Sequence, residues 1–363
     1  NADQSTYRVT RVNLCMDVFW TIVKIAVLVF ARSFIAFLVM DVLMKLTQNV
    51  FINREANRAY PYLREKSELP DKAERKVIFA NIGHIFIGKL SGKITSSTDN
   101  MLISVMDSTL SVGFYSNYAM IINNARTFMC QVVSATVGGI GNQMTVDLQR
   151  CYGTLKRLTF VMFMCSMAVC PALMGMLSEL VRAWLGPERV LSDGVVAVLL
   201  FNLMLFALRE PLWQFLTVSG QFKKDKNISI IGTVANLVIS IILGLKWGML
   251  GIFIGTTATL VIQYVLKTVL LCKEKLGVSP MDFLGLTGQY ILVETAAAAL
   301  CRFVCARLTL SNPWLDALVG AAVCVPLSLV LGGLVFARTA EMKYLLGLLR
   351  KGRDRLMKRR SKA

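Results

Sequence analysis

The chain has 363 residues, of which 55% are hydrophobic and only 17% are charged, and its mean hydropathy is +0.58. Soluble domains are about 45–50% apolar and about 25% charged, so this composition excludes an ordinary soluble protein and indicates an integral membrane protein. The net charge of +18 does not indicate nucleic-acid binding, because the basic residues lie between apolar segments and not along one soluble face.

Two apolar segments of membrane-spanning length open the chain, Val12–Phe30 and Phe34–Ile52. The second contains Asp41 and Lys45, which lie one helical turn apart. This i,i+4 spacing predicts a structural ion pair within the helix. A role for either charge in transport is the alternative.

Residues 53–76 are polar and basic, and Pro61 and Pro70 interrupt them. This is the long hydrophilic connection of the chain, and its change in composition predicts a cytoplasmic linker between two groups of helices. Residues 1–52 would then form one domain, and the second would begin at residue 77.

Eight further segments predict membrane spans, which gives an all-α polytopic membrane protein of about ten transmembrane helices. The first six, within residues 77–275, are Val77–Met106, Leu110–Val137, Leu155–Leu177, Val195–Val218, Ile228–Leu245 and Gly251–Leu271. The last two, Gly288–Val304 and Leu315–Phe336, form an additional pair (276–337), followed by a basic tail (338–363).

The distribution of Lys and Arg predicts the orientation of these spans. The residues before the first span, the 53–76 linker, every second loop and the tail carry most of the basic residues outside the spans. The opposite loops hold only Arg32, Arg182, Arg189, Lys246 and Arg307. Because cytoplasmic loops are enriched in basic residues, both ends of this chain are expected in the cytoplasm and the protein in the cell membrane.

Charged residues within the spans mark a candidate functional site. Lys89, Lys93, Asp99 and Arg126 lie between Val77 and Gln143, where a simple anchor would be aliphatic. A charge at the bilayer centre costs about 2.5–3.5 kcal/mol on insertion scales, so it normally faces protein or water. The three cations are candidate ligands for an anionic substrate. They could instead neutralise nearby acidic residues or extend to the interface.

Two other pairs of polar residues lie in the spans. Asp99 and Asn100 are candidates for binding Na⁺ or a proton in coupled transport, or they could cap or bend a helix near the outer surface. Arg209 and Glu210 are adjacent, next to Pro211, and are interpreted as a structural pair near a kink.

The sequence contains no motif typical of an enzyme, such as a Walker loop, HExxH or GxSxG. His84 is the only histidine, and the nine cysteines form no CxxC pair. We therefore predict neither a catalytic site nor a metal site, and no cofactor.

One stretch resembles a known family. Residues 97–104 read Ser-Thr-Asp-Asn-Met-Leu-Ile-Ser, and residues 112–118 read Val-Gly-Phe-Tyr-Ser-Asn-Tyr. Together they resemble the TDN-I-IS … VG-YSNY region of the Wzx-like flippases of bacterial polysaccharide repeat units. These belong to the multidrug/oligosaccharidyl-lipid/polysaccharide superfamily, and the resemblance extends to about Lys275.

The resemblance implies two six-helix lobes around a central cavity, and residues 77–275 would form the C-terminal lobe. Residues 1–52 would match the last two helices of the N-terminal lobe, so we expect that this chain, which begins at Asn1, lacks four preceding helices. The implied function is the transfer of an undecaprenyl-pyrophosphate-linked oligosaccharide to the outer leaflet by alternating access. Lipid-linked anionic oligosaccharide, membrane lipids under the basic tail and glycan polymerases are the expected partners.

Three other functions fit parts of the sequence. A cation-coupled multidrug exporter of the same superfamily should present acidic groups in its cavity, whereas Lys89, Lys93 and Arg126 are basic. A membrane-embedded glycan-assembly enzyme would need catalytic residues in a large external loop, and the longest predicted external loop is short. A non-transporting scaffold would differ from a flippase only in activity.

Overall fold

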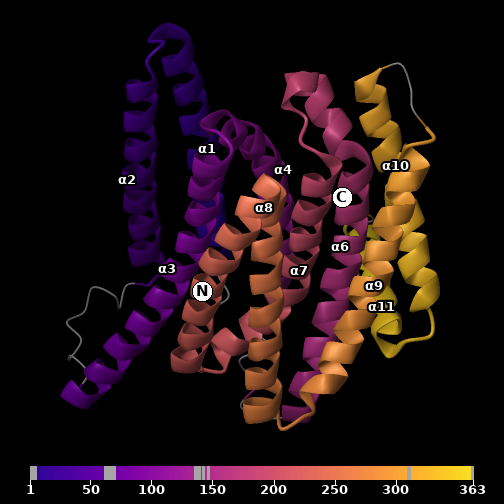
Figure 1. Ribbon diagram of the computed structural model, residues 1–363. Coiled ribbons are helices and arrows are strands. Elements are labelled where there is room, and N and C mark those ends of the chain that lie inside the picture. Colours follow the sequence, from indigo (N-terminus) through magenta and orange to yellow (C-terminus); the bar gives the residue numbers. More distant parts are fainter. Residues whose placement is uncertain are drawn as a thin grey trace. The chain divides into compact units, whose positions relative to one another are not determined.

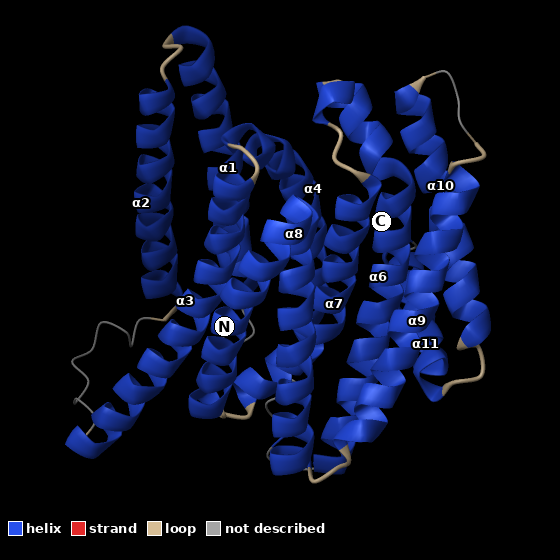
Figure 2. Cartoon of the chain, in the orientation of Figure 1, coloured by secondary structure: helices blue, strands red, loops and turns tan. Residues whose placement is uncertain are grey.

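The computed structural model describes residues 6–60, 71–134, 140, 144, 148–308 and 312–360. Within them all regular structure is helical, and no strand is present (Figure 2). The chain divides into two compact units, residues 1–76 and 77–363, which are described separately. Parts of the predicted linker, the end of the predicted span 110–137 and most side chains of the tail beyond Arg350 lie outside the described residues.

The smaller unit is a hairpin of α1 (Thr6–Phe30) and α2 (Phe34–Ala59). Its turn contains Arg32 in a left-handed conformation (φ 46°), and the hydroxyl of Ser33 caps α2 by accepting a hydrogen bond from the Ala36 amide. Most of its large apolar side chains are exposed, as expected for helices that face lipid.

Polar contacts join the two helices of this hairpin. Lys24 Nζ lies 2.8 Å from Asp41 Oδ1, and Gln48 Nε2 donates to Asp17 Oδ1 at 2.7 Å. Asp41 is thus paired with Lys24 across the hairpin. The pair with Lys45, which the spacing predicted, does not form. Lys24 is the more buried of the two lysines, so the pair with Asp41 compensates the charge that has less contact with the surroundings, whereas Lys45 is exposed.

In the described part of the larger unit, three long helices and a short 3-10 turn come first (Figure 1). They are α3 (Lys72–Met106), α4 (Thr109–Ser134), α6 (Leu148–Leu185) and the turn Pro187–Arg189. The remaining helices are α7 (Asp193–Val218), α8 (Phe222–Leu271), a π-helical turn (Cys272–Leu276), α9 (Pro280–Cys305), α10 (Pro313–Val335) and α11 (Ala340–Arg360).

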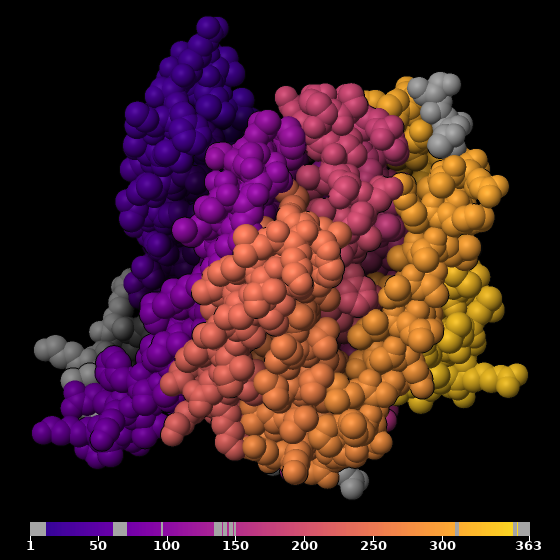
Figure 3. Space-filling model, in the orientation of Figure 1, coloured from indigo at the N-terminus to yellow at the C-terminus, as the bar shows by residue number. Residues whose placement is uncertain are grey.

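Helix α8 is two antiparallel arms and not one straight helix. The chain reverses at Gly248, whose dihedral angles (φ 58°, ψ −139°) are accessible only to glycine without strain. The arms are joined by hydrogen bonds from Asn236 Nδ2 to Thr256 Oγ1 and from Ser240 Oγ to the Ile252 carbonyl, both 3.1 Å. Figure 1 shows the arms side by side, and in Figure 3 they cover much of the face of this unit that is turned to the viewer.

Glycines explain why the arms approach so closely. A methyl group added at Gly251 would overlap the Leu243 carbonyl, and one at Gly255 would lie 2.7 Å from Ser240 Cα. Small residues permit such contacts between membrane helices, where dispersion replaces the hydrophobic effect. Gly88 and Gly92, which have the same four-residue spacing, have no described atom within 4 Å of an added Cβ, so this pair makes no close helix contact among the described residues.

Seven helices among the described residues are long and apolar enough to cross a membrane. One of these, Phe222–Leu276, includes both arms of α8. The polar helices α3 and α4, of 35 and 26 residues, are also long enough to span a bilayer. The predicted all-α polytopic class is therefore confirmed.

The core of the larger unit is centred on α6 and α7. Buried aliphatic and methionine side chains from these helices pack against α4 and the second arm of α8. A second cluster holds α9 and the end of α10 against α6, where the rings of Phe160, Phe163, Tyr290 and Phe336 stack or meet edge to face. This packing makes α6 and α7 the support for the helices that line the cavity described next.

Candidate functional site

A cavity of about 660 Å³ lies within the larger unit, bounded by α3, α4, α7 and both arms of α8. Hydroxyl and amide side chains, four aromatic rings and several charged groups line it. The inner-facing side of membrane helices normally carries such polar groups only where water or a substrate is accommodated. The charged groups are therefore the first candidates for function.

Two arginines share one aromatic ring in this cavity. The guanidinium carbon of Arg126, on α4, lies 3.5 Å from the centroid of the Phe206 ring, and that of Arg209, on α7, lies 5.7 Å from it. The two guanidinium carbons are thus no more than about 9 Å apart. Coulomb's law with an effective dielectric constant of about 20 gives a repulsion of at least about 2 kcal/mol between them.

Neither arginine has an acidic partner within ion-pair distance among the described residues. Arg209 Nη1 donates to the neutral Gln263 Oε1 at 3.4 Å, and its Nε is buried without a partner. Glu210 accepts a hydrogen bond from Gln214 Nε2 at 2.7 Å. The predicted pair of Arg209 with Glu210 does not form, because adjacent residues on a helix point about 100° apart.

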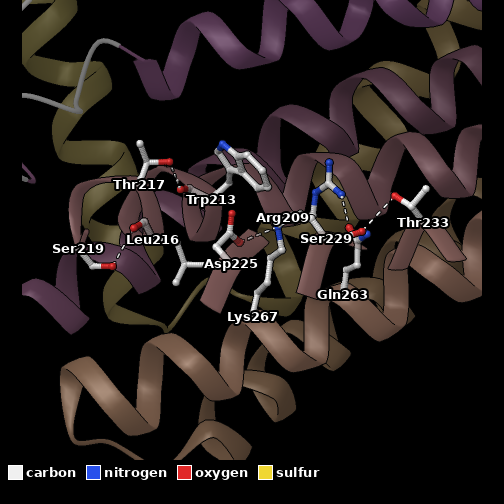
Figure 4. Close-up of polar contacts among 10 residues, drawn as sticks. All are labelled: Arg209, Trp213, Leu216, Thr217, Ser219, Asp225, Ser229, Thr233, Gln263 and Lys267. Atoms are coloured by element: carbon white, nitrogen blue, oxygen red, sulfur yellow. Dashed lines mark hydrogen bonds and ion pairs between the residues drawn. The ribbon is translucent and has the colours of Figure 1, made fainter. Parts of the chain in front are cut away.

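A third cation near the cavity is compensated. Lys267, on the second arm of α8, is 0% exposed; its Nζ lies 2.8 Å from Asp225 Oδ1 and 3.9 Å from the centroid of the Trp213 ring (Figure 4). Its ammonium also donates to Ser229 Oγ at 3.3 Å. This group ties α7 to both arms of α8, and its net charge is zero.

Asp99 lies in a different part of the cavity, with buried polar groups of α8. Its Oδ2 accepts from Thr256 Oγ1 at 3.0 Å, and Thr256 in turn accepts from Asn236 Nδ2. Asp99 Oδ1 and Asn236 Oδ1 are both buried without a hydrogen-bond partner in the described structure. An unsatisfied buried acceptor is costly, so two of them in one group of contacts form a candidate cation site.

The charges of the cavity are separated along the helix axes. With 1.5 Å per residue, Asp99 is about 10 Å from the end of α3 at Met106, the end that we expect to face outward. The starts of α4 and α7 lie on that same side of the unit. Arg126 is about 25 Å from the start of α4, and Arg209 is about 25 Å from the start of α7. The carboxylate thus lies toward the expected outer end and the arginines toward the inner end.

The other predicted site residues are placed as follows. Lys93 and Asn100 are exposed and line the cavity. Lys89 is also exposed but is not among the lining residues. Of the three predicted cations, Arg126 and Lys93 therefore border the cavity.

The tyrosines of the Phe-Tyr-Ser-Asn-Tyr segment have separate structural roles. Tyr115 lines the cavity, and its ring centroid lies 4.9 Å from that of Phe253. Tyr118 is fully buried, and its hydroxyl accepts a hydrogen bond from the Leu191 amide at 3.1 Å. Both rings face the protein interior and therefore do not form a belt at the membrane interface.

Within the described residues, no three His, Cys, Asp or Glu side chains form a group that could hold a metal ion. Sequence reasoning missed Phe206, Asn236, Thr256 and Lys267 as cavity or near-cavity residues. Lys267 could have been found, since it is a cation inside a predicted span.

No family model matches the sequence, and no curated protein matches it. Among solved structures, the chain is similar to the lipid II flippase MurJ in its inward closed conformation, with a TM-score of 0.58 and 13% sequence identity. The match covers 83% of this chain and 61% of the MurJ chain, so this chain spans about three fifths of the length of the MurJ chain. At this identity the similarity shows the fold. The chain therefore shares the fold of that structure over the matched residues.

Proposed function

We propose that the protein is a flippase for a lipid-linked anionic oligosaccharide of cell-surface polysaccharide biosynthesis. The observation that carries the proposal is the pair Arg126 and Arg209, two cations that have no ion-pair partner in the described part of the chain and lie in a cavity of a membrane-spanning unit. An undecaprenyl-pyrophosphate headgroup would supply the missing negative charge through charge-assisted hydrogen bonds. The fold shared with MurJ and the sequence resemblance to Wzx-like flippases support the same class of substrate.

The cavity also suits the sugar part of such a substrate. Amide groups of Asn123, Asn202 and Gln263 line it, together with the ring of Tyr115. These groups exchange hydrogen bonds with hydroxyl groups at little cost. The polyprenyl tail would stay in the bilayer, while rocking of two lobes exposes the cavity to one side and then the other.

A multidrug exporter of the same superfamily is less consistent with this cavity. Such a transporter would need acidic groups where a cationic drug binds. Among the described residues, Asp99 is the one carboxylate that lines the cavity, and it is 7% exposed and accepts a hydrogen bond from Thr256. The two arginines would repel a cationic drug.

Asp99 is our candidate for coupling transport to an ion. A monovalent cation could be held by Asp99 Oδ1 and Asn236 Oδ1, since oxygen atoms are the ligands that alkali cations use. The coupling is tested by measuring substrate delivery with and without an inward Na⁺ gradient. Wild type should respond to the gradient, and Asp99→Asn should not. A gradient response that persists in Asp99→Asn would exclude this site.

The basic C-terminal helix is proposed to lie on an anionic leaflet. Met342 is buried and Arg157 lies over the Tyr344 ring at 5.1 Å, which docks the start of α11 on α6. Leu348 and Leu349 are exposed and can enter the interface, while nearby cations would each contribute about 1 kcal/mol at the anionic surface. Glycan polymerases remain predicted partners on the grounds of the function alone.

The function is tested in cells whose own repeat-unit flippase has been removed. We would express the full-length protein and measure how much lipid-linked oligosaccharide reaches the outer leaflet. Arg126→Gln should leave the substrate in the inner leaflet. Lys89→Gln is the matched control. Lys89 is a cation on the neighbouring helix α3, and its side chain does not line the cavity.

Two results would contradict the proposal. Normal delivery by Arg126→Gln would show that the cation is structural. If wild type delivers nothing while the length or composition of glycan chains still changes, an assembly enzyme becomes the better account. The amount of each variant in the membrane fraction must match wild type.

A further inference from the structure

Glu294 is a carboxylic acid near the middle of a membrane-spanning helix. It lies about 21 Å from the start of α9 and about 17 Å from its end, and its side chain is 1% exposed. It is not among the residues that line the cavity. Its carboxyl is packed between α9 and α6, at a depth where ionisable groups are costly and usually functional.

Neutral groups of α6 contact this carboxyl. Ser166 Oγ donates to Glu294 Oε1 at 2.5 Å and lies 3.3 Å from Cys170 Sγ, and the Cys170 thiol is also close to the carboxyl. The second oxygen, Glu294 Oε2, is buried without a hydrogen-bond partner in the described structure. The contacts therefore leave half of the carboxyl unsatisfied.

No opposite charge compensates an ionised Glu294 among the described residues. The titratable group that faces it from α6 is the Cys170 thiol. On α9 itself, Tyr290 lies one turn earlier, and its ring stacks on that of Phe163 at 4.6 Å between centroids. Helices α7, α8 and α10 also pack against α9, and their described residues place no charged group against the carboxyl.

These surroundings suit a proton better than a metal cation. A buried carboxylate without an opposite charge is far less favourable than the neutral acid. Metal cations such as Ca²⁺ need several oxygen ligands, whereas the described oxygen beside this carboxyl is Ser166 Oγ alone. Asp99 differs in this respect, because Thr256 and Asn236 place further oxygens in its group of contacts.

We propose that Glu294 is a proton-binding site at which a bound proton holds α9 against α6 and whose release separates the two helices. On release, the O–H bond of the carboxyl breaks, its electron pair stays on the carboxylate, and the proton passes to water in the opened interface. A glutamate in water is ionised at neutral pH, so the open form binds one proton fewer and is favoured as the pH rises. The site goes beyond the proposed function, since it involves no substrate.

Infrared difference spectra test the protonation state. Wild type and Glu294→Gln are compared as full-length proteins in lipid nanodiscs at about pH 7. Wild type should show the carbonyl band of one neutral carboxyl that the variant lacks. Glu210→Gln is the matched control, because Glu210 is also buried but interacts with the charges of Arg126 and Arg209. That variant should lose the bands of a carboxylate.

Thiol labelling tests the release of α9. Cys301 lies two turns after Glu294, is 0% exposed, and belongs to the same buried cluster as Ala172 of α6. Its rate of modification by N-ethylmaleimide is measured by mass spectrometry of peptides between about pH 6 and about pH 8. Dividing by the rate in Glu294→Gln cancels the ionisation of the thiol itself. This ratio should rise about tenfold per pH unit, because opening releases one proton.

An internal control is Cys130 on α4, a helix that packs against α6 and α7. Its ratio should not change with pH. If Glu294→Gln does not fold, Glu294→Met, which also cannot ionise, replaces it in both measurements with the same expected results.

Either of two results would overturn the proposal. Carboxylate bands that are present in wild type and missing from Glu294→Gln would show that the buried group is ionised. A ratio at Cys301 that is constant with pH would show that the proton does not hold the interface. Both results would leave the flippase proposal intact, because Glu294 does not line the cavity.

Discussion

Two glycine pairs with the same spacing should respond in opposite ways to substitution by alanine. An added Cβ at Gly255 would lie 2.7 Å from Ser240 Cα, whereas one at Gly88 has no described atom within 4 Å. Contact at the ordinary distance of about 3.4 Å would require the arms of α8 to separate by about 0.7 Å at Gly255. The hydrogen bond from Ser240 Oγ to the Ile252 carbonyl, now 3.1 Å, would then be lost.

These changes set the size of the effect. Overpacking costs about 1–3 kcal/mol, and a hydrogen bond between membrane helices contributes about 0.6 kcal/mol. Alanine in place of glycine within a helix returns about 0.5–1 kcal/mol. We therefore expect Gly255→Ala to lower the free energy of unfolding by about 1–3 kcal/mol. Gly88→Ala should raise it by about 0.5–1 kcal/mol.

The assay is reversible unfolding in mixed detergent micelles, followed by circular dichroism. The two variants add the same methyl group, so differences in detergent binding largely cancel. Wild-type stability of Gly255→Ala would refute the close contact between the arms. A loss of stability in Gly88→Ala would show that this face of α3 packs against another part of the protein.

Three further predictions concern contacts outside the arginine pair. Lys267→Met should lower the free energy of unfolding by about 3 kcal/mol, because it leaves the charge of Asp225 uncompensated. Adding Asp225→Asn should recover most of this loss of stability. No recovery in the double variant would refute the pairing. Oxidation with copper phenanthroline should join Cys305 and Cys324, whose sulfurs are 3.4 Å apart, and mass spectrometry of peptides should find this link before any other. Tyr118→Phe should cost about 1 kcal/mol and speed hydrogen exchange in the loop at residues 186–192, so unchanged exchange there would argue against the hydroxyl contact.

The helices could be predicted from the sequence more reliably than their ends. The reversal of α8 at Gly248 lies within the predicted gap between 245 and 251. However, α2 continues to Ala59 and α3 begins at Lys72, well beyond the apolar segments. Hydropathy marks only where the hydrocarbon ends, and a helix can continue into water because its backbone hydrogen bonds are internal.

Pairing of charges was predicted less well, because spacing along the chain does not show which helix faces another. Asp41 was assigned to Lys45 within its helix, yet Lys24 lies at nearly the same distance from the turn on the other side of the hairpin. Arg209 was assigned to its neighbour in sequence. The i,i+3 spacing of Phe206 and Arg209 would have placed them on one helix face, toward the cavity.

The cation site needed the structure. Asn236 and Thr256 are twenty residues apart and are ordinary polar residues within apolar segments. Only the hairpin of α8, closed by the contact of Gly255 with Ser240, brings them together with Asp99. No local pattern in the sequence reports such a meeting of three segments.

The most direct test of the central claim is transfer of substrate by the purified full-length protein in liposomes. A lipid-linked oligosaccharide is placed in both leaflets, and its accessibility to a glycosidase that cannot cross the membrane is followed in time. The account predicts that wild type exposes nearly all of the substrate, while Arg126→Gln, at the same protein density, leaves the inner half protected. Equal protection with wild type and with empty liposomes would contradict the assignment as a flippase.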